Sequence, residues 1–65
     1  MKKPAILRDF RKLSHLTQDQ LFARSGITQS RISRLEIGNV RPSPRERKAL
    51  AHALKIPAEI LFPKV

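Results

Sequence analysis

The chain has 65 residues and no cysteine, so it is large enough for one small domain and excludes disulfide bonds as a source of stability. Fourteen lysine and arginine residues against five acidic residues give a formal net charge of +9, which favours nucleic acid or an anionic surface as the partner. No apolar run approaches the ~20 residues that cross a membrane, and the start is too polar for a signal peptide. We therefore expect one cytoplasmic domain over residues 1–65, with Met1 as a true start and a basic tail at residues 1–3.

The first predicted helix runs from about Pro4 to Ser14. Proline suits the first turn of a helix, because its missing N–H would have no partner there. Apolar residues then recur at helical spacing: Ile6, Leu7, Phe10 and Leu13. We interpret His15, in the connection that follows, as a loop residue without a functional role.

Thr17 begins the second predicted helix. The pattern Thr-x-x-Gln, with Gln20 at the third helical position, is a capping box in which each side chain bonds the other residue's backbone N–H. We expect this helix to end near Ser25 and Gly26, because glycine adopts the left-handed conformation that closes a helix and starts a tight turn. Ile27 is expected to enter the core from that turn.

Thr28 is the N-cap of the third predicted helix, which runs through about Glu36 or Ile37, and Gly38 stops it. Ile32 and Leu35 lie three residues apart and are assigned to its buried face. Two short helices joined by a tight turn are the plan of a DNA-binding helix-turn-helix.

Two further helices are predicted in the last third of the chain, over residues 44–54 and 58–62. Ser43, Pro44 and Glu46 supply three start signals for the first of them: a serine cap, proline at the first helical position and glutamate at the third. The sequence contains no strand pattern and no repeat, so the expected fold class is all-α.

The polar face of the third helix carries groups that suit DNA bases. Gln29 and Ser30 lie in its first turn, which lies nearest the base edges when such a helix enters the major groove. Arg34 follows Ser30 by one helical turn, so both point to one side. Glutamine pairs with adenine and arginine with guanine, so these three residues are the expected base contacts. An ordinary amphipathic helix explains the periodicity equally well, but not its coincidence with a tight turn and strong positive charge.

The stretch from Ile6 to Pro63 resembles the Cro and lambda-repressor-like helix-turn-helix family, which includes regulators of the xenobiotic-response-element type. The matching residues are Leu16 to Gln18, Leu21, Ser25 to Ile27, Gln29, Ile32, Leu35 to Gly38, Arg41, Pro42, Leu50 to Leu54 and the ending Ile60 to Phe62. The resemblance implies five short helices, with the helix-turn-helix at the second and third and the third helix in the major groove.

The resemblance also implies contacts to the DNA backbone. Gln18 opens the second helix, whose N-terminus favours a phosphate. Thr28 would combine capping with a phosphate contact, and capping alone is the alternative. Arg31 would reach a phosphate or remain solvated, whereas Asn39 and Arg41 lie in the loop that meets the backbone. Arg41 is also placed to enter the minor groove.

Two positions bear on the packing of the helices. The resemblance pairs Glu36 with an arginine of the first helix, matched here by Arg11, and we expect this structural ion pair to be partly buried. Phe22 departs from the family pattern, which has a small residue where the second and third helices cross. Either these helices cross further apart, or the role of the small residue shifts.

These observations predict a sequence-specific transcriptional regulator, expected to be a repressor that binds a palindromic operator as a homodimer. Its partners are double-stranded DNA and a second copy of the chain; we expect no membrane, no small-molecule ligand, no cofactor and no metal. The apolar ending contributes either to the dimer or to closure of the core, and we assign Ile60 and Leu61 to the core.

The main alternative is an antitoxin of a toxin–antitoxin pair, which would bind a toxin protein as well as its own operator. A restriction–modification controller, a basic peptide acting on anionic membranes and a helix-turn-helix used only for protein contacts are further alternatives. An enzyme is not expected, because the sequence has no acid pair, nucleophile–base set or glycine-rich phosphate loop.

Overall fold

The computed structural model describes residues 6–38 and 40–63, where the regular secondary structure consists of α-helices alone. Five helices follow one another: α1 (Ile6–Leu13), α2 (Gln18–Ser25), α3 (Gln29–Ile37), α4 (Pro44–Leu54) and α5 (Ala58–Leu61). The predicted all-α fold with five short helices is thereby confirmed. The predicted basic tail, Pro4 and Asn39 lie outside the described residues.

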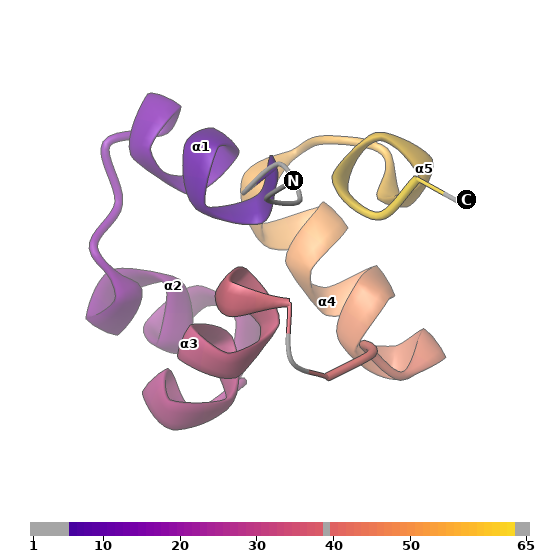
Figure 1. Cartoon of the computed structure of the whole chain (residues 1–65). Coiled ribbons are helices and arrows are strands. Elements are labelled where there is room, and N and C mark those ends of the chain that lie inside the picture. The colour runs from indigo at the N-terminus through magenta and orange to yellow at the C-terminus, as the bar shows by residue number, and fades with distance from the viewer. Residues whose placement is uncertain (1–5, 39, 64–65) are drawn as a thin grey trace.

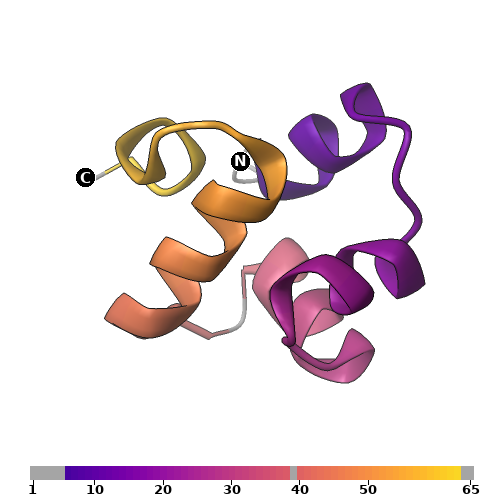
Figure 2. The same ribbon diagram turned by 180° about the vertical axis from the view of Figure 1, so that it is seen from behind.

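The helices divide into two ends joined by α4 (Figures 1 and 2). At one end α1 contacts α5, and at the other α2 contacts α3. The longest helix, α4, contacts both α2 and α5 and so connects the two ends. Each helix in the described part of the chain is too short or too polar to cross a lipid bilayer.

The boundaries of α2 follow from local hydrogen bonds. The Gln20 N–H donates to Thr17 Oγ1 at 3.1 Å, and the Thr17 N–H donates to Gln20 Oε1 at 2.8 Å, which confirms the capping box. Gly26 ends the helix at φ +75°, and its N–H donates to the Phe22 carbonyl oxygen at 2.8 Å. Because glycine reaches this left-handed conformation without steric cost, the chain turns sharply here into α3.

The boundaries of α3 and α4 are also those predicted. The Arg31 N–H donates to Thr28 Oγ1 at 3.3 Å, and Gly38 ends α3 at φ +88°. The Glu46 N–H donates to Ser43 Oγ at 3.2 Å, and the Ser43 N–H donates to Glu46 Oε1 at 2.8 Å. A second capping box therefore starts α4.

The core is one cluster of apolar side chains drawn from all five helices and two connections. Its buried members are Leu7, Leu16, Leu21, Ile27, Ile32, Leu35, Leu50, Leu54 and Leu61. The most deeply buried are Leu21, Ile32 and Leu50, one each from α2, α3 and α4. Burying each such side chain stabilises the fold by roughly 1.5–3 kcal/mol, so these three residues tie α2, α3 and α4 to one core.

Leu13 is not part of the apolar face that the sequence predicts, since its side chain is 72% exposed. The inward face of α1 is instead centred on Leu7 and Arg11, both buried. Leu13 follows Arg11 by two residues, which rotates it by about 200° around the helix and away from the core. A buried arginine therefore takes the place that the periodicity assigned to a leucine.

Two other apolar side chains also stay outside the core. Phe22 is 42% exposed, whereas its neighbour Leu21 is fully buried, so the bulky ring lies at the surface and outside the core. In the C-terminal helix, Leu61 is 2% exposed, which confirms its assignment to the core. Ile60 is 50% exposed, so the same assignment is wrong for Ile60. A helix as short as α5 (Ala58–Leu61) has one inward position, and Leu61 occupies it.

Candidate nucleic-acid interface

The α3 helix has one buried apolar face and one exposed polar face. Ile32 and Leu35 are buried in the core, at 0% and 7% exposure. The three residues predicted to contact bases, Gln29, Ser30 and Arg34, are all exposed. With nine residues, α3 is about 13 Å long, and this length fits the major groove of B-DNA.

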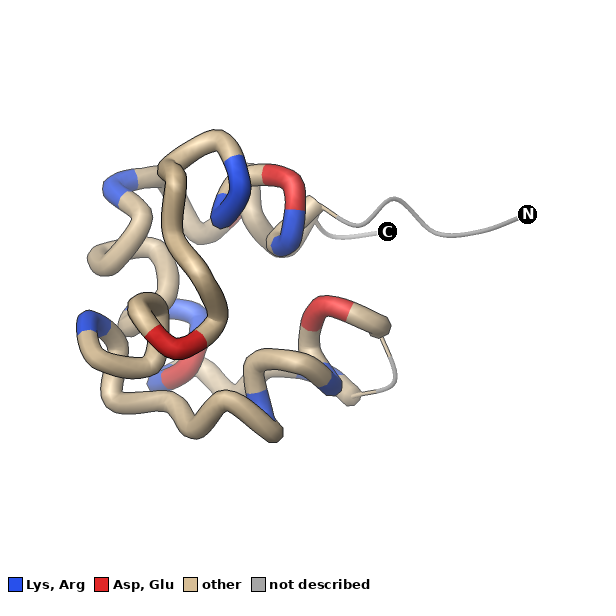
Figure 3. Tube along the Cα trace, turned by 90° about the vertical axis from the view of Figure 1, so that its left-hand side faces the viewer, with Lys and Arg blue, Asp and Glu red and all other residues tan. Residues whose placement is uncertain are grey.

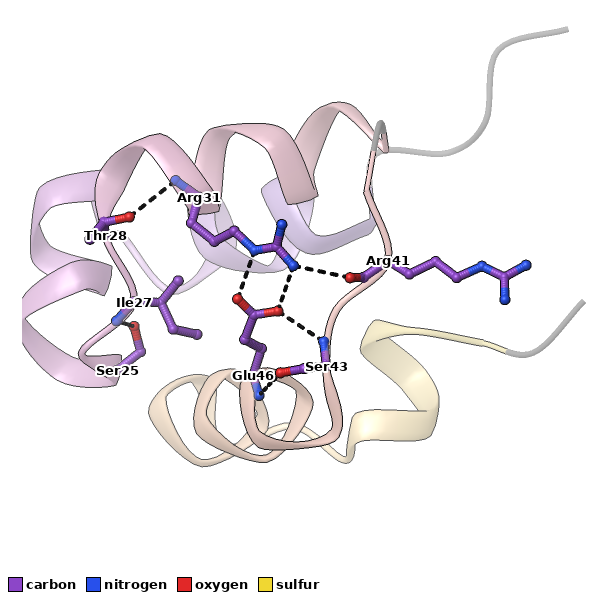
Figure 4. A network of polar contacts seen from close by, with 7 residues as sticks. All are labelled: Ser25, Ile27, Thr28, Arg31, Arg41, Ser43 and Glu46. Carbon is purple, nitrogen blue, oxygen red and sulfur yellow. Dashed lines mark hydrogen bonds and ion pairs between the residues drawn. The ribbon is translucent and has the colours of Figure 1, made fainter.

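The turn that sets the direction of α3 is held by Ser25. Its hydroxyl donates to the Leu21 carbonyl oxygen at 2.7 Å and accepts from the Ile27 N–H at 3.1 Å. One side chain thus joins the last turn of α2 to the residue that anchors the turn in the core (Figure 4). The sequence predicted the turn at Ser25 and Gly26, but it did not predict these two hydrogen bonds of the Ser25 hydroxyl.

Gln18 lies at the first position of α2 and is half-buried. Its side-chain Nε2 donates to Glu36 Oε1 at 3.0 Å, so the residue that opens α2 is hydrogen-bonded to the last turn of α3. This bond fixes the rotamer of the predicted phosphate ligand. The positive end of α2 at Gln18 favours an anion there.

Glu36 is also the acceptor of the ion pair that the family resemblance implies. Arg11 Nε donates to Glu36 Oε2 at 2.6 Å, and Arg11 Nη2 donates to Glu36 Oε1 at 3.1 Å. Arg11 Nη1 donates to the Leu16 carbonyl oxygen at 2.9 Å. The two side chains are only 10% and 4% exposed, so this bidentate pair links α1 to α3 inside the protein.

From the sequence, Arg31 is expected to reach a phosphate or to remain solvated. In the structure its guanidinium binds a glutamate on α4. Arg31 Nε donates to Glu46 Oε2 at 2.7 Å, and Arg31 Nη2 donates to Glu46 Oε1 at 2.9 Å (Figure 4). The hydrogen bond from Arg31, followed by that from the Ser43 N–H, lowers the pKa of Glu46 to about 2. The capping box predicted the local partner of Glu46, but no local pattern indicates that Arg31 shares it.

The exposed surface keeps the positive charge of the chain, and Figure 3 shows lysine and arginine distributed along most of the trace. Glu36 and Glu46 each pair with one arginine, so the two ion pairs leave the charge excess unchanged. The exposed basic side chains are Arg8, Lys12, Arg24, Arg34, Arg41, Arg45, Lys48 and Lys55. They outnumber the exposed acidic residues Asp9, Asp19 and Glu59, so the described surface attracts a polyanion.

An apolar groove of about 430 Å³ lies where the ends of α3 and α5 approach α1. Its lining includes Ile6, Ile37, Val40, Leu61 and Phe62. Ile37 is 66% exposed at this edge, although it belongs to α3. The groove therefore continues onto the exposed apolar side chain of Ile37, at the C-terminal end of α3.

Comparison with known proteins matches residues 7–61 to a family described as helix-turn-helix. Two uncharacterized HTH-type transcriptional regulators, from two strains of Mycobacterium tuberculosis, are each 33% identical to this chain over 58 residues. The matched segment covers 89% of this chain and 41% of each relative, so the chain spans about two fifths of the length of the curated relatives it matches. No solved structure matches the chain.

Proposed function

Because this chain belongs to the helix-turn-helix family, we propose that it is a sequence-specific DNA-binding regulator of transcription that reads the major groove with α3. The observation that carries the proposal is the two-sided character of α3. Gln29, Ser30 and Arg34 are exposed, while Ile32 and Leu35 hold the opposite side in the core. The exposed side chains offer the donors and acceptors that distinguish base pairs.

The contacts to the DNA backbone come from positions around α3. Gln18 and Thr28 lie at the starts of α2 and α3, where helix N-termini favour phosphate. Arg41 is exposed in the loop after α3 and adds a positive charge there. Asn39 joins this set from the family resemblance alone. Arg31 is left out of the direct contacts, because its guanidinium already binds Glu46.

We further propose a homodimer that binds a palindromic operator and represses transcription by blocking polymerase. Two copies would place one α3 in each half-site, about 34 Å apart. A domain of this size buries too little DNA surface by itself for tight specific binding. Exposed apolar side chains, Ile37 beside the groove and Ile60 on α5, supply apolar area for a contact between copies.

The names of the relatives favour a regulator over an antitoxin. Both are called HTH-type transcriptional regulators, and neither name mentions a toxin. A transcriptional regulator must reach the chromosome, so we place this chain in the cytoplasm. It includes no catalytic step and no small-molecule ligand.

The test is a selection of bound sequences from random duplex DNA at moderate salt. An enriched palindrome with half-sites about one DNA turn apart is the expected result. An enriched motif without symmetry would support sequence-specific binding but contradict the proposed homodimer. Binding without enrichment, lost as salt rises, would contradict sequence-specific regulation, because it reflects charge alone.

A further inference from the structure

One arginine–glutamate pair connects the candidate recognition helix to the helix that follows it. Arg31 on α3 and Glu46 on α4 form two parallel hydrogen bonds, at 2.7 and 2.9 Å. Their side chains are 33% and 17% exposed, so the pair is partly shielded from water. Bidentate charge-assisted bonds of this kind fix orientation more strongly than a single contact does.

The same two side chains hold the backbone of the loop between the helices (Figure 4). Arg31 Nη2 donates to the Arg41 carbonyl oxygen at 3.1 Å, and Glu46 Oε1 accepts from the Ser43 N–H at 2.8 Å. The residue between these two points is Pro42, which has no N–H to donate. The ion pair therefore binds one backbone group on each side of Pro42, the Arg41 carbonyl oxygen and the Ser43 N–H.

The side chain of Arg41 points away from this network. Its carbonyl oxygen is bound by Arg31, while its guanidinium extends outward from the loop (Figure 4). Arg31 is neutralised by Glu46, whereas the exposed guanidinium of Arg41 has no ion-pair partner within residues 6–38 and 40–63. The direction of that charge depends on the loop backbone, since the Cα–Cβ bond follows from the backbone conformation.

We propose that Arg31 and Glu46 are positioning residues that fix the loop so that Arg41 meets the DNA backbone beside α3. This inference rests on the proposed function. Arg31 then has an indirect role: its charge is neutralised by Glu46, and its hydrogen bond to the Arg41 carbonyl oxygen sets the path of the loop. DNA binding then depends on the pair only as long as Arg41 is present.

Two variants separate geometry from charge. Glu46→Gln keeps the capping box, because Gln20 fills the equivalent position at the start of α2. It nevertheless offers one acceptor oxygen in place of two, so the paired bonds with Arg31 are lost. Arg31→Lys keeps the positive charge and loses the planar fork.

The experiment measures operator binding at constant salt, below the melting temperature of every variant. We expect Glu46→Gln and Arg31→Lys each to weaken binding by about fivefold, and to change it less than about twofold when Arg41→Ala is already present. The matched control is Glu59→Gln, which removes the same negative charge from the exposed surface of α5. Charge alone would make Glu46→Gln bind more tightly, as this control should, so weakening has the opposite sign.

Tighter binding by Glu46→Gln, or equal losses with and without Arg41, would overturn the proposal. Backbone ¹⁵N relaxation of residues 40, 41 and 43 without DNA tests the loop independently. Increased motion of these residues in Arg31→Lys supports the role of the ion pair in holding the loop. This conclusion would stand even if the wild-type chain selected no DNA sequence, a result that would contradict only the proposed function. Unchanged motion of these residues in Arg31→Lys would show that the ion pair does not hold the loop, whatever the result for DNA binding.

Discussion

Arg11 and Glu36 lie 25 residues apart in the sequence and form a bidentate ion pair that is almost completely buried. The pair joins α1 to the last turn of α3, and Gln18 donates a further hydrogen bond to the same carboxylate. The negative charge on the candidate DNA-binding helix is therefore compensated inside the protein. This arrangement explains why a glutamate is compatible with a helix that is proposed to approach phosphates.

We expect Arg11→Ala to destabilise the fold by about 3–5 kcal/mol, because it leaves the Glu36 charge buried without its main partner. In a domain of this size the melting temperature would fall by more than about 10 °C. Circular dichroism during heating measures the change. Arg8→Ala is the control, since Arg8 is exposed on the same helix and should change stability little. An unchanged melting temperature for Arg11→Ala would show that the pair contributes no net stability.

Acid should weaken the fold through Glu46. Its pKa is about 2 in the folded chain and about 4.5 as a free side chain, so the unfolded chain binds the proton first as the pH falls. The contribution of the Glu46 carboxylate is thus complete above about pH 4.5 and is lost progressively down to about pH 2. Urea unfolding across this range should show a stability gap between wild type and Glu46→Gln that closes toward low pH. A gap that stays constant would mean that the pair with Arg31 does not lower the pKa.

Arg34→Ala should lose sequence preference by roughly 1–3 kcal/mol at one base pair, because arginine pairs with guanine through two hydrogen bonds. Gln18→Ala should instead weaken binding to all sequences alike, since phosphate contacts carry no sequence information. Titrations on the selected operator and on random duplex DNA measure both effects. Lys55→Ala is the control for charge loss away from α3. Equal losses on the two DNAs for both variants would contradict the assigned roles.

Two substitutions with opposite signs test the left-handed helix ends. Gly26→Ala should destabilise the fold by about 1–2 kcal/mol, because φ is +75°, a conformation that alanine adopts only with strain. The added methyl group would meet no atom within 4 Å, so a steric clash does not contribute. The cost is thus conformational strain. Lys55 closes α4 at φ +58° with a side chain attached, so Lys55→Gly should stabilise the fold. Denaturant unfolding of both variants gives the comparison. A stable Gly26→Ala would mean that the turn between α2 and α3 can change its path.

The affinity for DNA should fall steeply with salt, and Arg41→Ala should reduce the slope of log K against log salt by about 1. This slope counts displaced counterions and is independent of base reading. Filter binding or fluorescence anisotropy at several salt concentrations provides it. An Arg41→Ala slope equal to that of wild type would place the Arg41 side chain away from the phosphates.

Local sequence signals were enough to predict where α2, α3 and α4 begin and end. The signals are the capping boxes at Thr17 and Ser43 and the left-handed glycines at positions 26 and 38. Their hydrogen bonds join residues at most four apart, so a short stretch of sequence contains both donor and acceptor. The exposed and buried faces of α3 followed from the helical period for the same reason. The family resemblance added the pairing of Arg11 with Glu36, which no local pattern contains.

The packing of the helices against one another sets which partner each charged side chain meets and which apolar residues lie outside the core. Arg31 finds Glu46 at a separation of 15 residues, because the packing of α4 brings the two together. Leu13 is exposed because Arg11 takes the inward position on α1. Helical period and caps are properties of one segment, whereas burial and ion pairing depend on how segments pack against one another.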